Sequence, residues 1–181
     1  IGNIPEEGPA VVVCNHVSFV DALVILAASP RPIRFVMDHR IFAIPVLSFV
    51  FRTAKAIPIA PAKEDPALLE RAYDEVAAAL AQGDLVGIFP EGAITQDGEI
   101  QRFRTGISRI LERSPVPVVP MALKGLYGSF FSRHGGIAMT RPFRRGVFSR
   151  IALEVAPAMA PASVTPEALQ AKVAALRGGR R

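Results

Sequence analysis

A histidine and an aspartate five positions apart, His16 and Asp21, have the side chains needed to take a proton from a hydroxyl group. On one continuous helix these side chains would point about 140° apart and would not meet. They can meet if His16 lies in a loop and Asp21 lies in the first turn of the helix that follows. Asp21 would then accept the proton of one ring nitrogen, and the other nitrogen would act as a general base.

A structural interpretation of the same residues stays open. Ser18 and Asp21 form the Ser-x-x-Asp pattern of a capping box, in which Asp21 would only stabilise the start of a helix. Asn15 and Ser18 lie on either side of His16, and we expect both to contact the substrate if the segment is catalytic. From these residues alone, catalysis and helix capping remain alternatives.

A second candidate site is the segment Phe89-Pro90-Glu91-Gly92, which ends an apolar run that is predicted to be a strand. A carboxylate at the carboxyl end of a strand, beside a glycine that lets the backbone approach a ligand, is typical of sites in α/β folds. The alternative is an ordinary surface turn. We expect Glu91 and Gly92 to help shape a substrate site.

The elements that must position these segments alternate along the chain. Alternating strand and helix patterns predict a single α/β domain over residues 1–181, with a mixed, mostly parallel sheet flanked by helices. Pro45 predicts a kink within one apolar helix, and Asp65 with Pro66 predicts the start of the clearest helix. The expected strands are residues 10–14, 33–37, 56–59, 85–89, 116–123 and 148–155, and the expected helices are residues 19–28, 39–50, 65–83, 105–113 and 165–176.

The charge of the chain is positive and unevenly distributed. The formal net charge is +5, and the stretch from Gln101 to Arg150 contains ten Lys or Arg residues but one acid, Glu112. Such a stretch suits phosphate groups or anionic lipid, and no nucleic-acid-binding motif accompanies it. The most apolar segment, Ile41 to Phe51, is too short to span a bilayer, which needs about 20 residues. It would lie either in the core or on a membrane surface.

Several other chemistries are disfavoured by the residues present. A single cysteine, Cys14, excludes an internal disulfide, and its place in an apolar run favours a buried thiol. His16, His39 and His134 lack the spacing of metal ligands, so we expect neither a metal nor a bound cofactor. No Gly-x-Ser-x-Gly nucleophile motif is present, which argues against a serine hydrolase.

Four segments occur in a fixed order: His16-x4-Asp21, Phe89-Pro90-Glu91-Gly92, Phe103-Arg104-Thr105-Gly106 and Val116-Pro117-Val118-Val119-Pro120. Together they resemble the PlsC-like family of lysophospholipid and glycerol-phosphate acyltransferases, over residues 9 to about 155. The resemblance implies the glycerolipid acyltransferase fold. It also implies that His16 and Asp21 activate an acceptor hydroxyl, which attacks an acyl thioester of coenzyme A or acyl carrier protein without a covalent enzyme intermediate.

The sequence departs from this family at two positions where many phosphatidate-forming members carry a phosphate-binding arginine. Ile94 occupies one position, and Ala60 or a neighbour occupies the other. A phosphate monoester carries close to two negative charges and favours such an arginine, whereas a diester headgroup carries one. A lysophosphatidylethanolamine-like acceptor is therefore favoured over lysophosphatidate. The cations expected to contact the acceptor are Lys55, Arg102 and Arg104.

The third motif, Glu91 to Thr95, resembles the acyltransferase half of 2-acylglycerophosphoethanolamine acyltransferases, which are often fused to a lysophospholipid transporter. Because the chain starts at Ile1, we expect it to be a fragment of a longer membrane protein, located at the cytoplasmic face of the inner or plasma membrane. We expect Arg40 to Lys55 and the basic stretch after Gln101 to contact the bilayer. The alternatives are a phosphatidate-forming acyltransferase, a non-catalytic lipid-binding module on the same fold, and a hydrolase.

Overall fold

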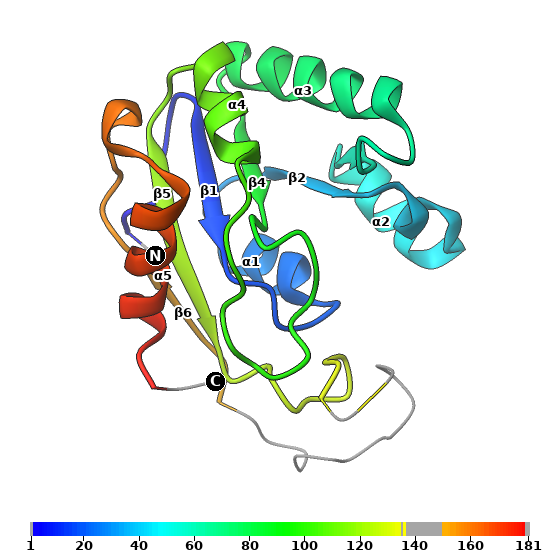
Figure 1. The fold of residues 1–181 in the computed structure, drawn as a ribbon, viewed down its shortest axis with the longest axis vertical. Coiled ribbons are helices and arrows are strands. Elements are labelled where there is room, and N and C mark those ends of the chain that lie inside the picture. Colours follow the sequence, from blue (N-terminus) through cyan, green and yellow to red (C-terminus); the bar gives the residue numbers. More distant parts are fainter. Residues whose placement is uncertain (1, 135, 137–149, 180–181) are drawn as a thin grey trace.

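Six strands form one sheet at the centre of the protein (Figure 1). The structure is a computed structural model that describes residues 2–134, 136 and 150–179. The strands are β1 (Ala10–Cys14), β2 (Ile33–Asp38), β3 (Ile57–Ile59), β4 (Leu85–Ile88), β5 (Val118–Lys124) and β6 (Ala152–Val155). They lie in the order β3-β2-β4-β1-β5-β6, and β6 is antiparallel to β5 while the other pairs are parallel. The predicted α/β fold with a mixed, mostly parallel sheet is confirmed.

Helices cover both faces of this sheet. They are α1 (Asp21–Ala28), α2 (Pro45–Thr53), α3 (Pro66–Ala81), α4 (Gly106–Arg113) and α5 (Pro166–Arg177), with 3-10 turns η1 (His39–Ala43) and η2 (Pro161–Ser163). Asp65 caps α3 as predicted, because its carboxylate accepts the amide proton of Leu68 at 2.8 Å. Pro66 follows at a position where its missing amide proton costs no helical hydrogen bond.

Strand β1 is buried along its whole length because both of its faces are covered. Val11 and Val13 point into an apolar layer formed with α3, α4 and α5. Val12 and Cys14 point into the opposite layer, formed with α1 and α2. The alternation of side chains along a strand thus places successive residues of β1 in two separate cores.

One expected element differs in kind from that observed, and several others differ in their bounds. The segment 39–50 was expected to form one kinked helix, but it forms η1 and then α2, with a break at Ile44. Ile44 has the extended backbone angles φ −89° and ψ 114°, which the following Pro45 favours because its ring disfavours a helical residue before it. The last strand was expected from residue 148 and begins at Ala152. Residues 150 and 151 are not in a strand, and residues 148 and 149 lie outside the described residues.

The arrangement of β1 and β4 brings the two candidate segments together. The strands are parallel neighbours, with Val13 opposite Ile88, so both end at the same edge of the sheet. Residues 15–20 follow β1 and form the His16 loop, and residues 89–105 follow β4 and form the Glu91 loop. Binding sites in α/β folds commonly lie at this edge, beyond the carboxyl ends of the strands.

Candidate active site

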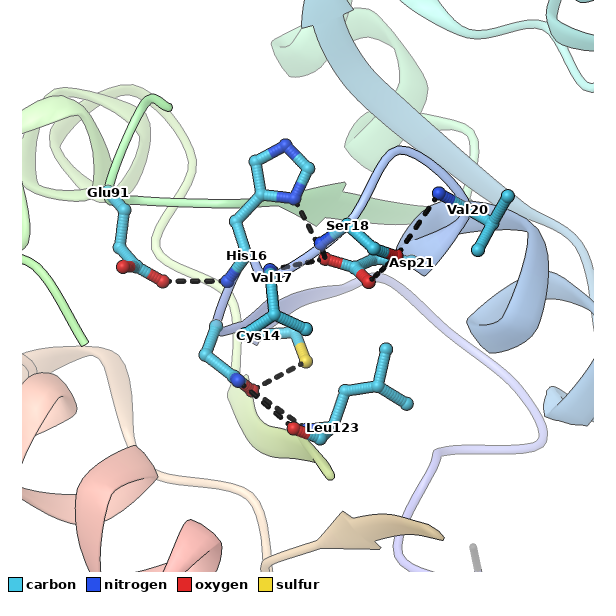
Figure 2. Close-up of polar contacts among 9 residues, drawn as sticks. Cys14, His16, Val17, Ser18, Val20, Asp21, Glu91 and Leu123 are labelled. Carbon is cyan, nitrogen blue, oxygen red and sulfur yellow. Dashed lines mark hydrogen bonds and ion pairs between the residues drawn. The ribbon is translucent and has the colours of Figure 1, made fainter. Parts of the chain in front are cut away.

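His16 and Asp21 meet at the end of β1, at the start of α1 (Figure 2). The Nδ1 atom of His16 lies 2.9 Å from Oδ2 of Asp21. The Asp21 side chain is fully buried, whereas the His16 side chain retains 20 % of its exposure. A buried carboxylate on Nδ1 fixes the proton there, and this leaves Nε2 as the nitrogen that is able to accept a proton.

Asp21 also holds the loop that carries His16. Its Oδ2 accepts the amide protons of Val17 at 2.6 Å and Ser18 at 2.9 Å, and its Oδ1 accepts the hydroxyl of Ser18 at 2.6 Å. The bond from the amide of Ser18 is half of a capping box. The other half is absent, because the Ser18 hydroxyl binds the carboxylate and α1 begins at Asp21 itself. One side chain therefore serves both the helix start and the histidine.

The ring of His16 is oriented from a second side by an aromatic stack. It lies parallel to the ring of Phe89, with centroids 4.2 Å apart, and Phe89 in turn stacks on Phe35 at 5.3 Å. In Figure 2 the ring edge that carries Nε2 points away from Asp21. Within the described residues no hydrogen bond engages Nε2. The ring is thus held by its Nδ1 edge and one face, with Nε2 available to a substrate.

Glu91 lies beneath this loop and binds backbone on both sides. Its Oε1 accepts the amide proton of His16 at 2.6 Å, and its Oε2 accepts that of Gln101 at 2.7 Å. Its residue exposure is 3 %. Burial raises the pKa of Glu91 to about 7, while its two amide bonds and the charge of Arg177 act to lower it. Since both oxygens are occupied by backbone, Glu91 shapes the site by joining the two loops.

Gly92 and Arg104 lie against each other in the Glu91 loop. Gly92 has a φ of +69°, and a Cβ added to it would lie 2.6 Å from the guanidinium carbon of Arg104. Only glycine permits both this backbone conformation and the close approach of the arginine. Arg104 is exposed, as is Arg102, which makes no hydrogen bond to any residue in the described part of the chain. These two cations remain at the surface of the Glu91 loop.

Three predicted substrate contacts are placed elsewhere by the structure. Asn15 is fully buried and exchanges two hydrogen bonds with the backbone of Leu123, so it anchors the loop to β5. Ser18 is also fully buried and is committed to Asp21. Lys55 precedes the outer strand β3, three strand spacings of about 4.8 Å from β1 and at the opposite end from His16. None of the three side chains lies beside Nε2.

Two residues that contribute to the site were not predicted. Phe89 was recognised only as part of a motif, although an aromatic residue that follows a strand is a reasonable stacking partner for a neighbouring histidine. Arg177, at the end of α5, donates to the carbonyl of Gly98 at 2.6 Å and to Glu99 at 2.8 Å, and so holds the Glu91 loop. In the sequence Arg177 is an ordinary cation in the last turn of a helix.

The chemistry that this arrangement supports is proton transfer to and from a hydroxyl or thiol. Cys14 lies close by but is buried, and burial raises its pKa well above the ordinary value, so it is an inert thiol. Among the described residues, no group of three or more His, Cys, Asp or Glu side chains is arranged to hold a metal ion. His16 is the residue of the site that is positioned to act as a base.

Comparisons with known proteins found related sequences and a related structure. Residues 1–124 match the sequence family described as Acyltransferase. The chain is 31 % identical over 124 residues to a chloroplastic 1-acyl-sn-glycerol-3-phosphate acyltransferase of Brassica napus, covering 68 % of this chain and 35 % of that protein. It is 31 % identical over 133 residues to an N-acylphosphatidylethanolamine synthase of Arabidopsis thaliana, covering 67 % of this chain and 46 % of that protein. The chain thus spans about a third to a half of these relatives.

A solved structure shares the fold. The 1-acyl-sn-glycerophosphate acyltransferase PlsC of Thermotoga maritima superposes with a TM-score of 0.72 over 95 % of this chain and 66 % of that chain. The sequence identity between the two is 21 %. The likeness therefore establishes the common architecture of the sheet and its helices.

Proposed function

Since the chain belongs to the acyltransferase family, we propose that it transfers an acyl chain from a thioester donor to the free hydroxyl of a lysophospholipid at a membrane surface. The observation that carries this proposal is the His16–Asp21 pair, with Nδ1 bound at 2.9 Å to a buried carboxylate and Nε2 directed away from it. A non-catalytic lipid-binding module would not need a histidine held in this state.

The proposed reaction uses His16 twice. Nε2 takes the proton of the acceptor hydroxyl as its oxygen attacks the thioester carbonyl, and the Asp21 carboxylate stabilises the imidazolium that forms. The tetrahedral intermediate then collapses, the carbon–sulfur bond breaks, and the thiolate takes the proton back from Nε2. The products are the diacyl lipid and free thiol of coenzyme A or acyl carrier protein, and His16 returns to its starting state.

For the acceptor we propose a lysophospholipid with a headgroup, of the lysophosphatidylethanolamine kind. Ile94, and Ala60 or a neighbour, stand where many phosphatidate-forming members carry an arginine for a phosphate monoester. Ile94 and Ala60 are both buried, with 8 % and 2 % exposure. The exposed Arg102 and Arg104 are suited to the single charge of a diester. The names of the relatives favour a second candidate, acylation of lysophosphatidate. The link to transporter-fused enzymes rests on residues 91–95 and stays a prediction.

The membrane surface is proposed from apolar side chains that flank the site. Phe49 and Ile44, within the predicted membrane segment Arg40 to Lys55, are 73 % and 48 % exposed. Phe130 and Phe131, after β5, are 36 % and 38 % exposed. The carbonyl of Phe131 accepts the amide proton of Phe19, which joins this segment to the His16 loop. Exposed Phe and other apolar side chains suit insertion at the boundary between headgroups and acyl chains.

Two further statements concern membrane attachment. Part of the basic stretch after Gln101, residues 137–149, lies outside the described residues, so its predicted contact with lipid stays a prediction. Among the described residues, no helix has the length and apolarity that crossing a bilayer requires. The cytoplasmic face is likewise a prediction.

The test measures product formation from two labelled donors, acyl-coenzyme A and the acyl thioester of acyl carrier protein. Each donor is supplied with lysophosphatidylethanolamine or with lysophosphatidate as the acceptor. We expect diacyl product, with the larger kcat/KM for lysophosphatidylethanolamine, and a rate about 10²-fold to 10⁴-fold lower with His16→Ala. Free fatty acid as the main product would identify a hydrolase, and lipid binding without turnover would identify a binding module. A preference for lysophosphatidate would replace the first acceptor with the second.

A further inference from the structure

The last helix of the described chain holds the Glu91 loop at two separate places. Arg177 donates to the carbonyl of Gly98 and to the carboxylate of Glu99, and its side chain is 12 % exposed. About two helical turns earlier on α5, the side-chain oxygen of Gln170 accepts the amide proton of Phe103 at 3.1 Å. Helix α5 lies beyond residues 1–124, the part that matches the family.

The loop that α5 holds is bound directly to the catalytic histidine. Glu91 accepts the amide protons of His16 and Gln101, so it fastens the start of the His16 loop to the far side of the Glu91 loop. The amide of Thr95 donates in turn to the carbonyl of His16 at 3.0 Å. His16 is therefore fixed by its side chain through Asp21 and by its backbone through the Glu91 loop.

We propose that Arg177 and Gln170 are positioning residues for acyl transfer, which hold the Glu91 loop in the conformation that fastens the backbone of His16. This inference rests on the proposed function, since the reaction it concerns is the one assigned to His16. Neither side chain touches the reacting atoms. Each acts through the amides and carbonyls of the Glu91 loop.

The charge of Arg177 gives it a second effect that Gln170 cannot share. As a carboxylate, Glu91 accepts an amide proton strongly on each oxygen, and protonation would weaken one of these bonds. Burial and the nearby charge of Asp21 raise the pKa of Glu91, whereas Arg177 lowers it. The guanidinium of Arg104 lies on the neighbouring Gly92. Loss of Arg177 should therefore both loosen the loop and protonate Glu91 at a higher pH. Loss of Gln170 should only loosen the loop.

The experiment compares Arg177→Met, Arg177→Lys and Gln170→Leu in the whole chain, with kcat, KM and the pH profile of kcat/KM as readouts. We expect kcat to fall about 10-fold to 100-fold in Arg177→Met and in Gln170→Leu, because small misplacements of a catalytic group cost this much. The acid limb of the profile should move to higher pH only in Arg177→Met. Arg177→Lys should keep the limb near its wild-type position.

A double variant decides whether Arg177 acts through Glu91. In a Glu91→Gln background, Arg177→Met should no longer shift the acid limb. The amide hydrogens of His16 and Gln101 provide a readout that requires no substrate, and we expect them to exchange about tenfold faster in Arg177→Met. Wild-type exchange rates and kcat in Arg177→Met would overturn the inference, as would an equal limb shift in both backgrounds. Near wild-type activity in His16→Ala would instead overturn the proposed function, whatever the exchange rates.

Discussion

The His16 loop and the Glu91 loop end neighbouring strands, but they are stabilised in opposite ways. The His16 loop is six residues long and is closed by a residue next to it, since Asp21 accepts the protons of Val17 and Ser18 as well as that of His16. The Glu91 loop spans residues 89–105 and is held from outside, by His16 on one side and by Arg177 and Gln170 on the other. The first loop is closed by a sequence neighbour, with Asn15 and Glu91 as further anchors, whereas the second depends on a distant helix.

The residues proposed to transfer the proton and the residues that hold their backbone thus come from different parts of the chain. The proposed proton-transfer pair forms within six consecutive residues, because Asp21 binds both the ring of His16 and the amides of Val17 and Ser18. The backbone that orients this pair depends on α5, because Gln170 and Arg177 lie 67 and 79 positions from their partners Phe103 and Gly98. We therefore expect variants in the His16 loop to affect the reaction first, and variants in the Glu91 loop to affect stability and the reaction together.

The largest expected effect is that of His16→Ala. Removal of a general base typically costs about 10²-fold to 10⁴-fold in rate, and the partly exposed ring contributes little to the core. We expect kcat to fall by this amount while the free energy of unfolding changes by less than about 1 kcal/mol. The measurements are steady-state kinetics and denaturant unfolding. Near wild-type turnover would break the assignment of the His16 loop as the catalytic one.

Glu91 should give the Glu91 loop a pH-dependent stability. Its pKa in the folded protein is raised from 4.5 to about 7. A raised pKa means that the folded state holds the proton more tightly, so this contribution is complete below about pH 4.5 and is lost as the pH rises through about 7. We expect wild type to lose up to about 3 kcal/mol relative to Glu91→Gln across this range.

Denaturant unfolding of both proteins from pH 4 to pH 8 measures this effect, because the difference between the two curves cancels groups that titrate in both. A difference that stays constant with pH would show that Glu91 does not titrate in this window. The Glu91 loop would then have no pH-dependent stability to distinguish it from the His16 loop.

Asp21→Asn isolates the charge of Asp21 from its hydrogen bonds. The amide oxygen can take the place of Oδ2, which accepts three donors, and the amide nitrogen can donate to the hydroxyl of Ser18. We expect kcat to fall about 10-fold to 100-fold, because the imidazolium loses its anionic partner, with a stability loss of about 1 kcal/mol or less. Ser18→Ala, which keeps the charge, is the matched control and should retain more activity. Full activity of Asp21→Asn would reduce Asp21 to a helix-start residue.

Gly92→Ala should produce the smallest effect of the four. An alanine at this position would have to adopt the φ of +69° that Gly92 has, which is unfavourable for a residue with a Cβ. Its Cβ would also displace the guanidinium of Arg104. The backbone term is about 1–2 kcal/mol, and the displaced arginine is an exposed, flexible side chain. We expect a lower free energy of unfolding and a modest rise in KM for the acceptor. An unchanged KM would indicate that Arg104 does not contact the headgroup.

The sequence predicted the locally determined parts of the molecule well. Strand β1 and helix α3 could be placed because an apolar run and the Asp65-Pro66 pair are local signals. The contact of His16 with Asp21 could be anticipated because it spans five residues. The burial of Asn15 could not, since it depends on the backbone of Leu123, which is 108 positions away. The same holds for Arg177, whose partners are determined by how α5 packs on the sheet.

The packing of α5 has a consequence for how this chain can be divided. A piece that ends at residue 124 contains the whole segment that matches the family, including His16, Asp21 and Glu91. It would lack the last strand, β6, and the helix whose Leu169 and Val173 are fully buried against the sheet. It would also lack Gln170 and Arg177, whose side chains form hydrogen bonds with the Glu91 loop. We therefore expect full activity to require a piece that extends beyond the segment matching the family, to Arg177 at least.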